Sequence, residues 1–178
     1  LNKNAVFKFL YKIPSTRKIL HKLAGNKLQK MFGGKIHFFG IGGAMLSYEV
    51  EKFLWEAGFP YAIGYGLTET SPLIAGGGPK AMKFRSTGIT IPGLEVRIDK
   101  PNPKTGEGEI QVKGDSVMIG YYKDPERTKE VFTEDGFFKT GDLGILKPTT
   151  YLYIKGRIKN VIIGPSGENI YPEELEAI

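Results

Sequence analysis

One stretch of the sequence predicts both a strand end and a chemistry: Tyr65-Gly66-Leu67-Thr68-Glu69-Thr70-Ser71-Pro72. It follows an apolar run that indicates a buried strand. An aromatic ring, a hydroxyl group and a carboxylate lie close together in it, at Tyr65, Thr68 and Glu69. The ring is suited to stack on a base, the hydroxyl to donate to a phosphate oxygen, and the carboxylate to hold Mg²⁺ against phosphates. By chemistry alone, the stretch is either part of a nucleotide site or an ordinary polar loop.

The residues before this stretch predict a strand, a helix and a second strand that pairs in parallel with the first. Apolar runs at 35–39 and 61–65 are the expected strands. Ser47 is the expected N-cap of the helix between them, and Gly58 is expected to end it. Ligands of such sheets bind beyond the carboxyl ends of the strands. The loops at those ends are residues 40–45 and 64–71.

Beyond residue 92 the sequence predicts a small antiparallel β-subdomain. Short alternating runs are separated by residues that favour turns. One helix interrupts them, because Asp124-Pro125-Glu126 supplies an N-cap, an N1 proline and a first-turn acid. The expected strands are residues 94–98, 109–113, 137–140, 143–146 and 151–155.

The positive charge of the chain is concentrated in residues 1–35, where every charged residue is Lys or Arg. The whole chain of 178 residues carries a formal net charge of +6. Helical spacing of apolar and basic residues runs through this basic arm and is interrupted at Pro14. Such an arm is suited to anionic lipid or nucleic acid, or forms a solvated helix pair that packs on another part of a longer chain.

Composition excludes several classes of site. Without cysteine there are no disulfides, thiolate metal sites or cysteine nucleophiles. The two histidines, His21 and His37, do not have the spacing of a zinc site. The sequence contains no apolar run of the roughly 20 residues needed to span a bilayer. Because it starts at Leu1 and ends inside an expected helix, we expect a fragment of a longer polypeptide.

Residues 65–72 resemble the Y-G-x-T-E motif of the adenylate-forming superfamily, which includes acyl-CoA synthetases, peptide-synthetase adenylation domains and luciferases. Further segments resemble other motifs of this family in sequence order, so that the resemblance covers about residues 33–178. They are a G-G-A turn (42–44), a barrel motif (106–110 and 120–122), a T-G-D segment (135–143), a hinge (156–160) and the first loop of the C-terminal domain (167–176).

The resemblance implies an α/β plus antiparallel β fold. The chain would be the C-terminal part of the large N-terminal domain, followed by the start of the small α+β C-terminal domain. The expected parts are the end of the α/β AMP-binding subdomain (1–92), a β-barrel-like subdomain (93–158), and the hinge with the truncated start of the C-terminal domain (159–178).

Roles in nucleotide binding follow from the resemblance. The backbone at Gly43, Ala44, Gly64 and Gly66 would flank the adenine, with Tyr65 stacked on it. Thr68 would contact the α-phosphate, and Glu69 would bind the magnesium ion. Asp142 would accept hydrogen bonds from both ribose hydroxyls, since a carboxylate forms strong charge-assisted bonds. Arg157 would also reach the ribose. From the residues alone, the favoured interpretation of Asp142 is a turn residue after Gly141, and that of Arg157 is a surface ion pair.

Two further positions belong to the second half of the reaction. Lys159 would be the hinge about which the small domain rotates, and Gly167 would line the pantetheine tunnel of coenzyme A. Without the resemblance, Lys159 is an exposed linker residue. The phosphate loop and the adenylation lysine of the family would lie outside this chain, so we expect the fragment by itself to be inactive.

The resemblance therefore implies part of an acid–thiol ligase, most like long-chain fatty acid–CoA ligases, that uses ATP, Mg²⁺ and coenzyme A. One alternative is an enzyme that loads the acyl group on a carrier-protein thiol, and another is a non-catalytic nucleotide-binding relative. The implied partners are a fatty acid and coenzyme A, not nucleic acid. The expected location is cytoplasmic, with peripheral contact at the inner face of the membrane through residues 1–35 left open. Acyl chain length and oligomeric state are not readable from the sequence.

Overall fold

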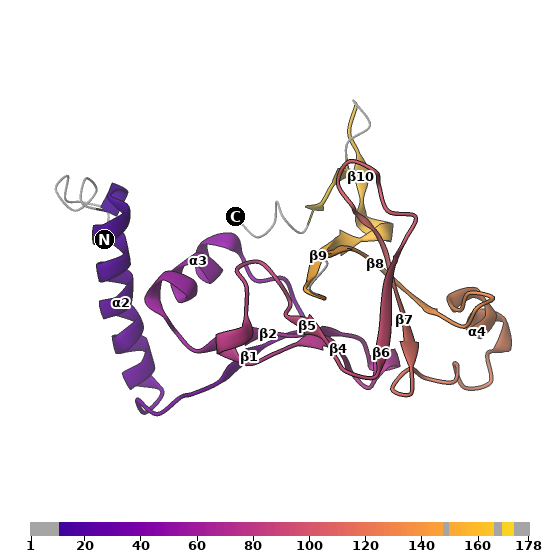
Figure 1. Cartoon of the computed structure of the whole chain (residues 1–178), viewed down its shortest axis with the longest axis horizontal. Helices are drawn as coiled ribbons and strands as arrows, with labels where there is room; N and C mark the ends of the chain where they lie inside the picture. Colours follow the sequence, from indigo (N-terminus) through magenta and orange to yellow (C-terminus); the bar gives the residue numbers. More distant parts are fainter. Residues whose placement is uncertain (1–10, 148–149, 166–168, 173–178) are drawn as a thin grey trace.

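A computed structural model describes residues 11–147, 150–165 and 169–172. A helical and α/β part comes first, and an antiparallel β part follows (Figure 1). This order confirms the expected α/β plus antiparallel β fold. Short 3₁₀ helices link the strands at Thr68–Thr70 (η1), Pro79–Ala81 (η2) and Ile158–Asn160 (η3).

The basic arm contains one long described helix, α2 (Pro14–Met31). Its first residue is the expected interruption, because proline has no N–H to lose in the first turn and its φ suits a helix start. Arg17 donates from Nε and Nη2 to the two carboxylate oxygens of Glu56 on α3 (Tyr48–Ala57), at 2.9 and 2.7 Å. The lysines of α2 are exposed. Contact of this arm with lipid, or its packing on another part of a longer chain, stays a prediction.

None of the helices in the described part of the chain is both long and apolar enough to cross a membrane.

The expected parallel unit is present. Strand β1 (Phe39–Ile41) pairs in parallel with β2 (Tyr61–Ile63), and α3 connects them. Ser47 Oγ accepts from the backbone N–H of Val50, and Gly58 ends the helix with φ of 65°. Both predicted helix ends are therefore confirmed.

Two strand boundaries in this unit differ from the prediction. The first strand begins at Phe39 and not at residue 35, because only Phe39 and Ile41 turn inward onto the core around Leu54 and Tyr61. The run 61–65 is not one strand. It breaks at Gly64, and β3 (Tyr65–Gly66) then pairs antiparallel with β4 (Leu73–Gly76).

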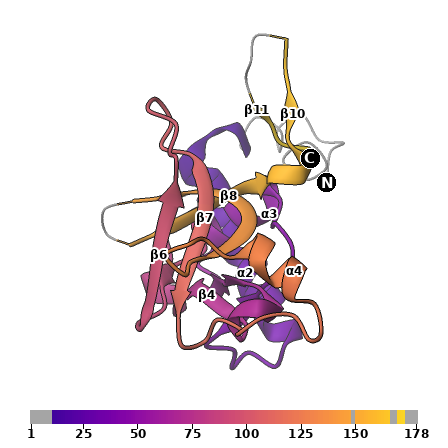
Figure 2. The same ribbon diagram turned by 90° about the vertical axis from the view of Figure 1, so that its right-hand side faces the viewer.

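The antiparallel part is a four-stranded sheet whose strands lie in the order β6 (Leu94–Asp99), β7 (Gly108–Gly114), β8 (Phe138–Leu146) and β9 (Leu152–Arg157). In Figure 2 the strands β6 and β7 run side by side. Its core contains Ile110, Val112 and Leu152 together with Ile74 of β4, so the two parts share apolar side chains. The remaining elements of the described residues are β5 (Ile89–Thr90), α4 (Pro125–Val131), β10 (Ile162–Ile163) and β11 (Asn169–Ile170).

The helix α4 has the predicted N-cap, since Asp124 Oδ1 accepts from the N–H of Arg127 at 3.0 Å. The two strands expected at 137–140 and 143–146 form the single strand β8. Gly141 does not end it, because its φ of 72° is accommodated in an irregularity of the pairing with β7. The predicted domain boundaries at residues 92 and 158 stay predictions.

Candidate functional site

A pocket of about 390 Å³ lies where the α/β part meets the four-stranded sheet. One wall is the turn after β1, and a second wall is β3 with the residues that flank it. The ends of β8 and β9 form the third wall. A pocket of this size, with apolar walls and a few polar groups, is typical of small-molecule sites.

The residues predicted to surround adenine and ribose all line this pocket, although they come from distant parts of the sequence. The turn after β1 and strand β3 lie at the carboxyl ends of β1 and β2, as expected for a ligand site on a parallel unit. The predicted residues in the lining are Gly43, Ala44, Gly64, Tyr65, Gly66, Asp142 and Arg157.

Asp142 on β8 is the charged centre of the pocket and is only 4% exposed. Its Oδ2 accepts a hydrogen bond of 2.7 Å from the hydroxyl of Tyr65, and its Oδ1 lies 3.0 Å from Nε of Arg157 on β9. A buried carboxylate is costly unless it is paired, and both neighbours supply that pairing. Asp142 is therefore a strand residue and not a turn residue, and the ion pair of Arg157 is made with Asp142 itself.

Tyr65 keeps its proton in this arrangement. Burial, and after it the negative charge of Asp142, raises the pKa of the Tyr65 hydroxyl well above its usual value. The phenol is thus a permanent hydrogen-bond donor to Asp142 at physiological pH. Its ring packs against the core that contains Ile74 and Ile110 and forms part of the pocket wall.

Gly66 allows the chain to turn sharply beside the pocket. A Cβ atom at this position would lie 1.7 Å from the carbonyl oxygen of Pro72, so only glycine fits. The loop that follows is held by Thr70, which is fully buried. Its Oγ1 donates towards the carbonyls of Leu67 and Pro72 and accepts from the N–H of Leu67. Thr70 was not among the site residues predicted from the sequence.

Thr68 and Glu69 do not line the pocket. They lie on η1 beyond its edge, where Thr68 is exposed. Glu69 Oε1 accepts a hydrogen bond of 3.0 Å from the hydroxyl of Tyr121, whose pKa is raised by burial and then by this bond. Proteins commonly bind Mg²⁺ through a single carboxylate together with substrate phosphates and water, so Glu69 fits the predicted role as a metal ligand. Among the described residues no group of three or more His, Cys, Asp or Glu is placed to hold a metal ion.

A second polar cluster in the pocket wall was not predicted. Glu51 on α3 is 1% exposed, and its Oε1 accepts from the hydroxyl of Tyr61 at 3.1 Å and from the backbone N–H of Arg85 at 2.7 Å. Its Oε2 pairs with Nη1 of Arg85 at 3.2 Å. Arg85 has φ of 65°, an unusual value for a residue with a side chain. A signal was available, because Glu51 lies three residues before Leu54 on the apolar face of its helix.

The two positions predicted for the second half-reaction have different outcomes. Lys159 is exposed on η3, directly after β9, and its neighbour Asn160 lines the pocket. Gly167 lies outside the described residues.

In a comparison with known protein families, the family described as AMP-binding enzyme matches residues 5–122 of this chain. Long chain acyl-CoA synthetase 6 of Arabidopsis thaliana, a peroxisomal protein, is 37% identical over 176 residues. That match covers 92% of this chain and 25% of the relative. A chloroplast long-chain-fatty-acid–acyl-carrier-protein ligase of the same plant is 36% identical over 175 residues, which cover 88% of this chain and 24% of that protein. This chain spans about a quarter of the length of the curated relatives it matches.

Solved structures of CoA synthetases are also similar to this chain. O-succinylbenzoate CoA synthetase of Bacillus subtilis, in complex with its acyl-adenylate intermediate, matches with a TM-score of 0.70 at 34% identity. The match covers 80% of this chain and 30% of that one. The complex of the same enzyme with ATP and magnesium ion matches with a TM-score of 0.65 at 34% identity, over 75% of this chain and 29% of that chain.

Proposed function

Because this chain belongs to the AMP-binding enzyme family, we propose that it is part of a ligase that activates a fatty acid with ATP and transfers it to coenzyme A. In the first step a carboxylate oxygen of the acid attacks the α-phosphorus of ATP, and the bond from that phosphorus to the pyrophosphate oxygen breaks. In the second step the thiolate of coenzyme A attacks the acyl carbon, and AMP leaves.

The buried carboxylate of Asp142 is the observation that carries this proposal. It lies in a pocket with Tyr65 on one side and Arg157 on the other. A carboxylate has about four lone-pair sites, so it can accept from a ribose while it stays bonded to the protein. The flat Tyr65 ring and the glycine backbone at Gly43 and Gly66 provide surfaces that a base can approach closely. These features suit an adenosine unit.

The remaining residues would act on the phosphates. Thr68 and Glu69 follow the pocket wall on η1, where a nucleotide seated in the pocket would extend its phosphates. Magnesium, when bound, supplies neutralisation of the phosphate charge, and Glu69 would hold it. Arg157 would place a positive charge beside the ribose. The protein's contribution is to hold the reacting groups in position and to stabilise the charge that develops.

The nature of the acceptor thiol has a second candidate. The two Arabidopsis relatives have nearly the same identity to this chain, yet one name specifies coenzyme A and the other an acyl carrier protein. Both names specify a long-chain acid, which supports a fatty acid as the substrate.

The test uses the full-length protein that contains this chain. Exchange of labelled pyrophosphate into ATP is measured with a series of fatty acids from short to long. Thioester formation is then measured with coenzyme A and, separately, with acyl carrier protein. We expect exchange with long-chain acids and transfer to coenzyme A. Transfer only to the carrier protein would identify the second candidate, and a protein that exchanges with no acid would contradict the ligase proposal.

A further inference from the structure

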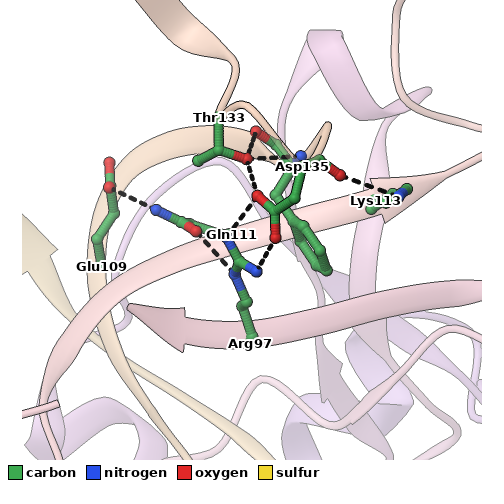
Figure 3. Close-up of polar contacts among 7 residues, drawn as sticks. Arg97, Glu109, Gln111, Lys113, Thr133 and Asp135 are labelled. Atoms are coloured by element: carbon green, nitrogen blue, oxygen red, sulfur yellow. Dashed lines mark hydrogen bonds and ion pairs between the residues drawn. The ribbon is translucent and has the colours of Figure 1, made fainter. Parts of the chain in front are cut away.

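A chain of polar side chains crosses the four-stranded sheet outside the pocket (Figure 3). Arg97 on β6 donates from Nε to Oε1 of Gln111 on β7, at 2.9 Å. Gln111 then donates from Nε2 to Oε2 of Glu109 on the same strand, at 3.3 Å. Gln111 is only 2% exposed, so its amide is buried and needs both of these bonds. Arg97, Gln111 and Glu109 are called the polar chain below.

The inner end of the polar chain lies at the residue next to Asp142 in the sequence of β8. The other oxygen of Glu109, Oε1, accepts from the backbone N–H of Gly141 at 3.2 Å. Gly141 directly precedes Asp142, the buried carboxylate of the pocket. The polar chain therefore ends on the peptide group between Thr140 and Gly141, one residue before the proposed ribose ligand.

The bond to Gly141 has a specific task because β8 is irregular there. Glu109 pairs with Leu143 and Gln111 pairs with Lys139, so the three residues 140–142 lie opposite Ile110 alone. Such a bulge leaves N–H groups outside the regular ladder, and side chains must bind them. Glu109 binds the N–H of Gly141, and Thr140 Oγ1 accepts from the N–H of Asp142 at 3.1 Å.

The outer end of the polar chain is anchored in the loop that precedes β8. Arg97 donates from Nη1 and Nη2 to the carboxylate of Asp135, which also accepts from the hydroxyl of Thr133 at 2.6 Å. The guanidinium of Arg97 lies 3.8 Å from the ring centroid of Phe137. Figure 3 shows Arg97 between Asp135 and Gln111. The polar chain thus links the loop before β8 to the bulge in β8.

We propose that Glu109 is a positioning residue for Asp142, and that Gln111 and Arg97 hold Glu109 in place for this task. This inference rests on the proposed nucleotide site. Without the bond from Glu109, the Gly141 peptide is free to rotate, since glycine tolerates many backbone conformations. Asp142 keeps its pairing with Arg157 of β9 and the bond from its N–H to Thr140, but the residue before it is no longer fixed, so the depth of its carboxylate in the pocket varies.

The experiment compares four variants of the full-length protein with the wild type. Glu109→Met removes the acceptor for Gly141, whereas Glu109→Gln keeps one oxygen for it. Arg97→Lys weakens the outer end, because an ammonium group cannot bind Gln111 and Asp135 as a guanidinium fork does. Glu95→Gln, at an exposed position on the same sheet, is the matched control. The AMP dissociation constant, the KM for ATP and for a fatty acid, kcat, and the melting temperature are measured.

We expect Glu109→Met to raise the AMP dissociation constant and the KM for ATP by about tenfold, in line with one lost hydrogen bond to a charged group. The KM for the fatty acid should stay within about twofold, since Asp142 faces the nucleotide. Glu109→Gln should restore most of the affinity, Arg97→Lys should raise the KM for ATP by a smaller factor, and Glu95→Gln should change nothing. If Glu109→Met does not fold, Glu109→Gln and Arg97→Lys still test the proposal, since both leave the inner contact partly intact.

A purely structural role predicts a different pattern. Partial unfolding lowers the active fraction, so kcat falls while both KM values and the AMP affinity stay unchanged, and that result would overturn the inference. A further variant, Asp142→Ala, distinguishes a failure of the positioning role from a failure of the proposed nucleotide site. If Asp142→Ala abolishes AMP binding while Glu109→Met leaves AMP binding unchanged, only the positioning role of Glu109 is wrong. If the wild type itself binds no AMP, the proposed function and this inference both fail.

Discussion

Replacing Asp142 by alanine in the full-length protein removes the acceptor that we assign to both ribose hydroxyls. Hydrogen bonds to charged groups contribute roughly 1.5–3 kcal/mol each, so the gross loss for two bonds is about 3 kcal/mol or more. Part of this is offset, because Asp142 is already bonded to Tyr65 and Arg157 before a nucleotide arrives. We therefore expect ATP and AMP to bind about tenfold more weakly or worse, equivalent to at least about 1.4 kcal/mol.

The same change has a stability cost that must be measured separately. The Tyr65 hydroxyl loses its acceptor in a largely buried position, which costs about 1–3 kcal/mol, whereas the Arg157 side chain is 57% exposed and regains water. Asp142→Asn keeps the shape and one acceptor oxygen, so its affinity should lie between those of the wild type and the alanine variant. Asp115→Ala, which removes an exposed carboxylate, is the control for a general loss of charge.

Isothermal titration calorimetry at a temperature where all variants are folded gives the affinities, and thermal unfolding gives the stability. An alanine variant that is folded and binds ATP as tightly as the wild type would refute the ribose assignment. A loss of affinity that Asp115→Ala reproduces would refute it as well, since the effect would then come from net charge alone.

Three further predictions follow from the described contacts. Arg85→Gly suits the local φ of 65° but removes the guanidinium that binds Glu51 in the pocket wall. ATP affinity, measured by calorimetry, should therefore fall about three- to tenfold. An unchanged ATP affinity would mean that only the backbone of Arg85 matters. Arg97 lowers the pKa of Asp135 well below its usual range, so this pair stabilises the fold above about pH 4 and the contribution is lost as the pH falls further. Urea unfolding of Arg97→Met should therefore show a deficit at pH 7 that becomes smaller in acid, where only the loss of the Gln111 contact remains, and a deficit that does not change with pH would contradict the pairing. Lys159→Pro restricts the backbone at the predicted hinge. When the two half-reactions are assayed separately, thioester formation should collapse while pyrophosphate exchange survives. Normal thioester formation in this variant would refute the assignment of Lys159 as the hinge.

The features that were predictable from the sequence have local signals. Ser47 and Gly58 mark the ends of α3 by their own chemistry, and Asp124 does the same for α4. The parallel pairing of the first two strands follows from a short helix between two apolar runs. The gathering of Tyr65 and Asp142 in one pocket was implied by the family resemblance, not by spacing.

The features that were not predictable depend on partners distant in the sequence. The break at Gly64 arises because β3 pairs with β4, and no local residue type announces this change of partner. The sequence around Gly141 suggested a strand end, yet β8 continues because Glu109, from another strand, binds the bulge. Glu51 was unexpected because its partner Arg85 lies 34 residues away. Polar pairs of this kind need the tertiary structure before they can be recognised.

The exposed position of Arg157 has a consequence for how the pocket is coupled to the segment after β9. The buried charge of Asp142 is neutralised by a side chain that is more than half exposed and that belongs to the last residue of β9, immediately before η3. Any rearrangement of the segment beyond β9 that displaces Arg157 changes the electrostatic potential at the carboxylate. Thermodynamic reciprocity then requires a ligand on the carboxylate to bias that segment by the same factor. Occupancy of the pocket and the position of the segment beyond β9 are in this way coupled in one equilibrium.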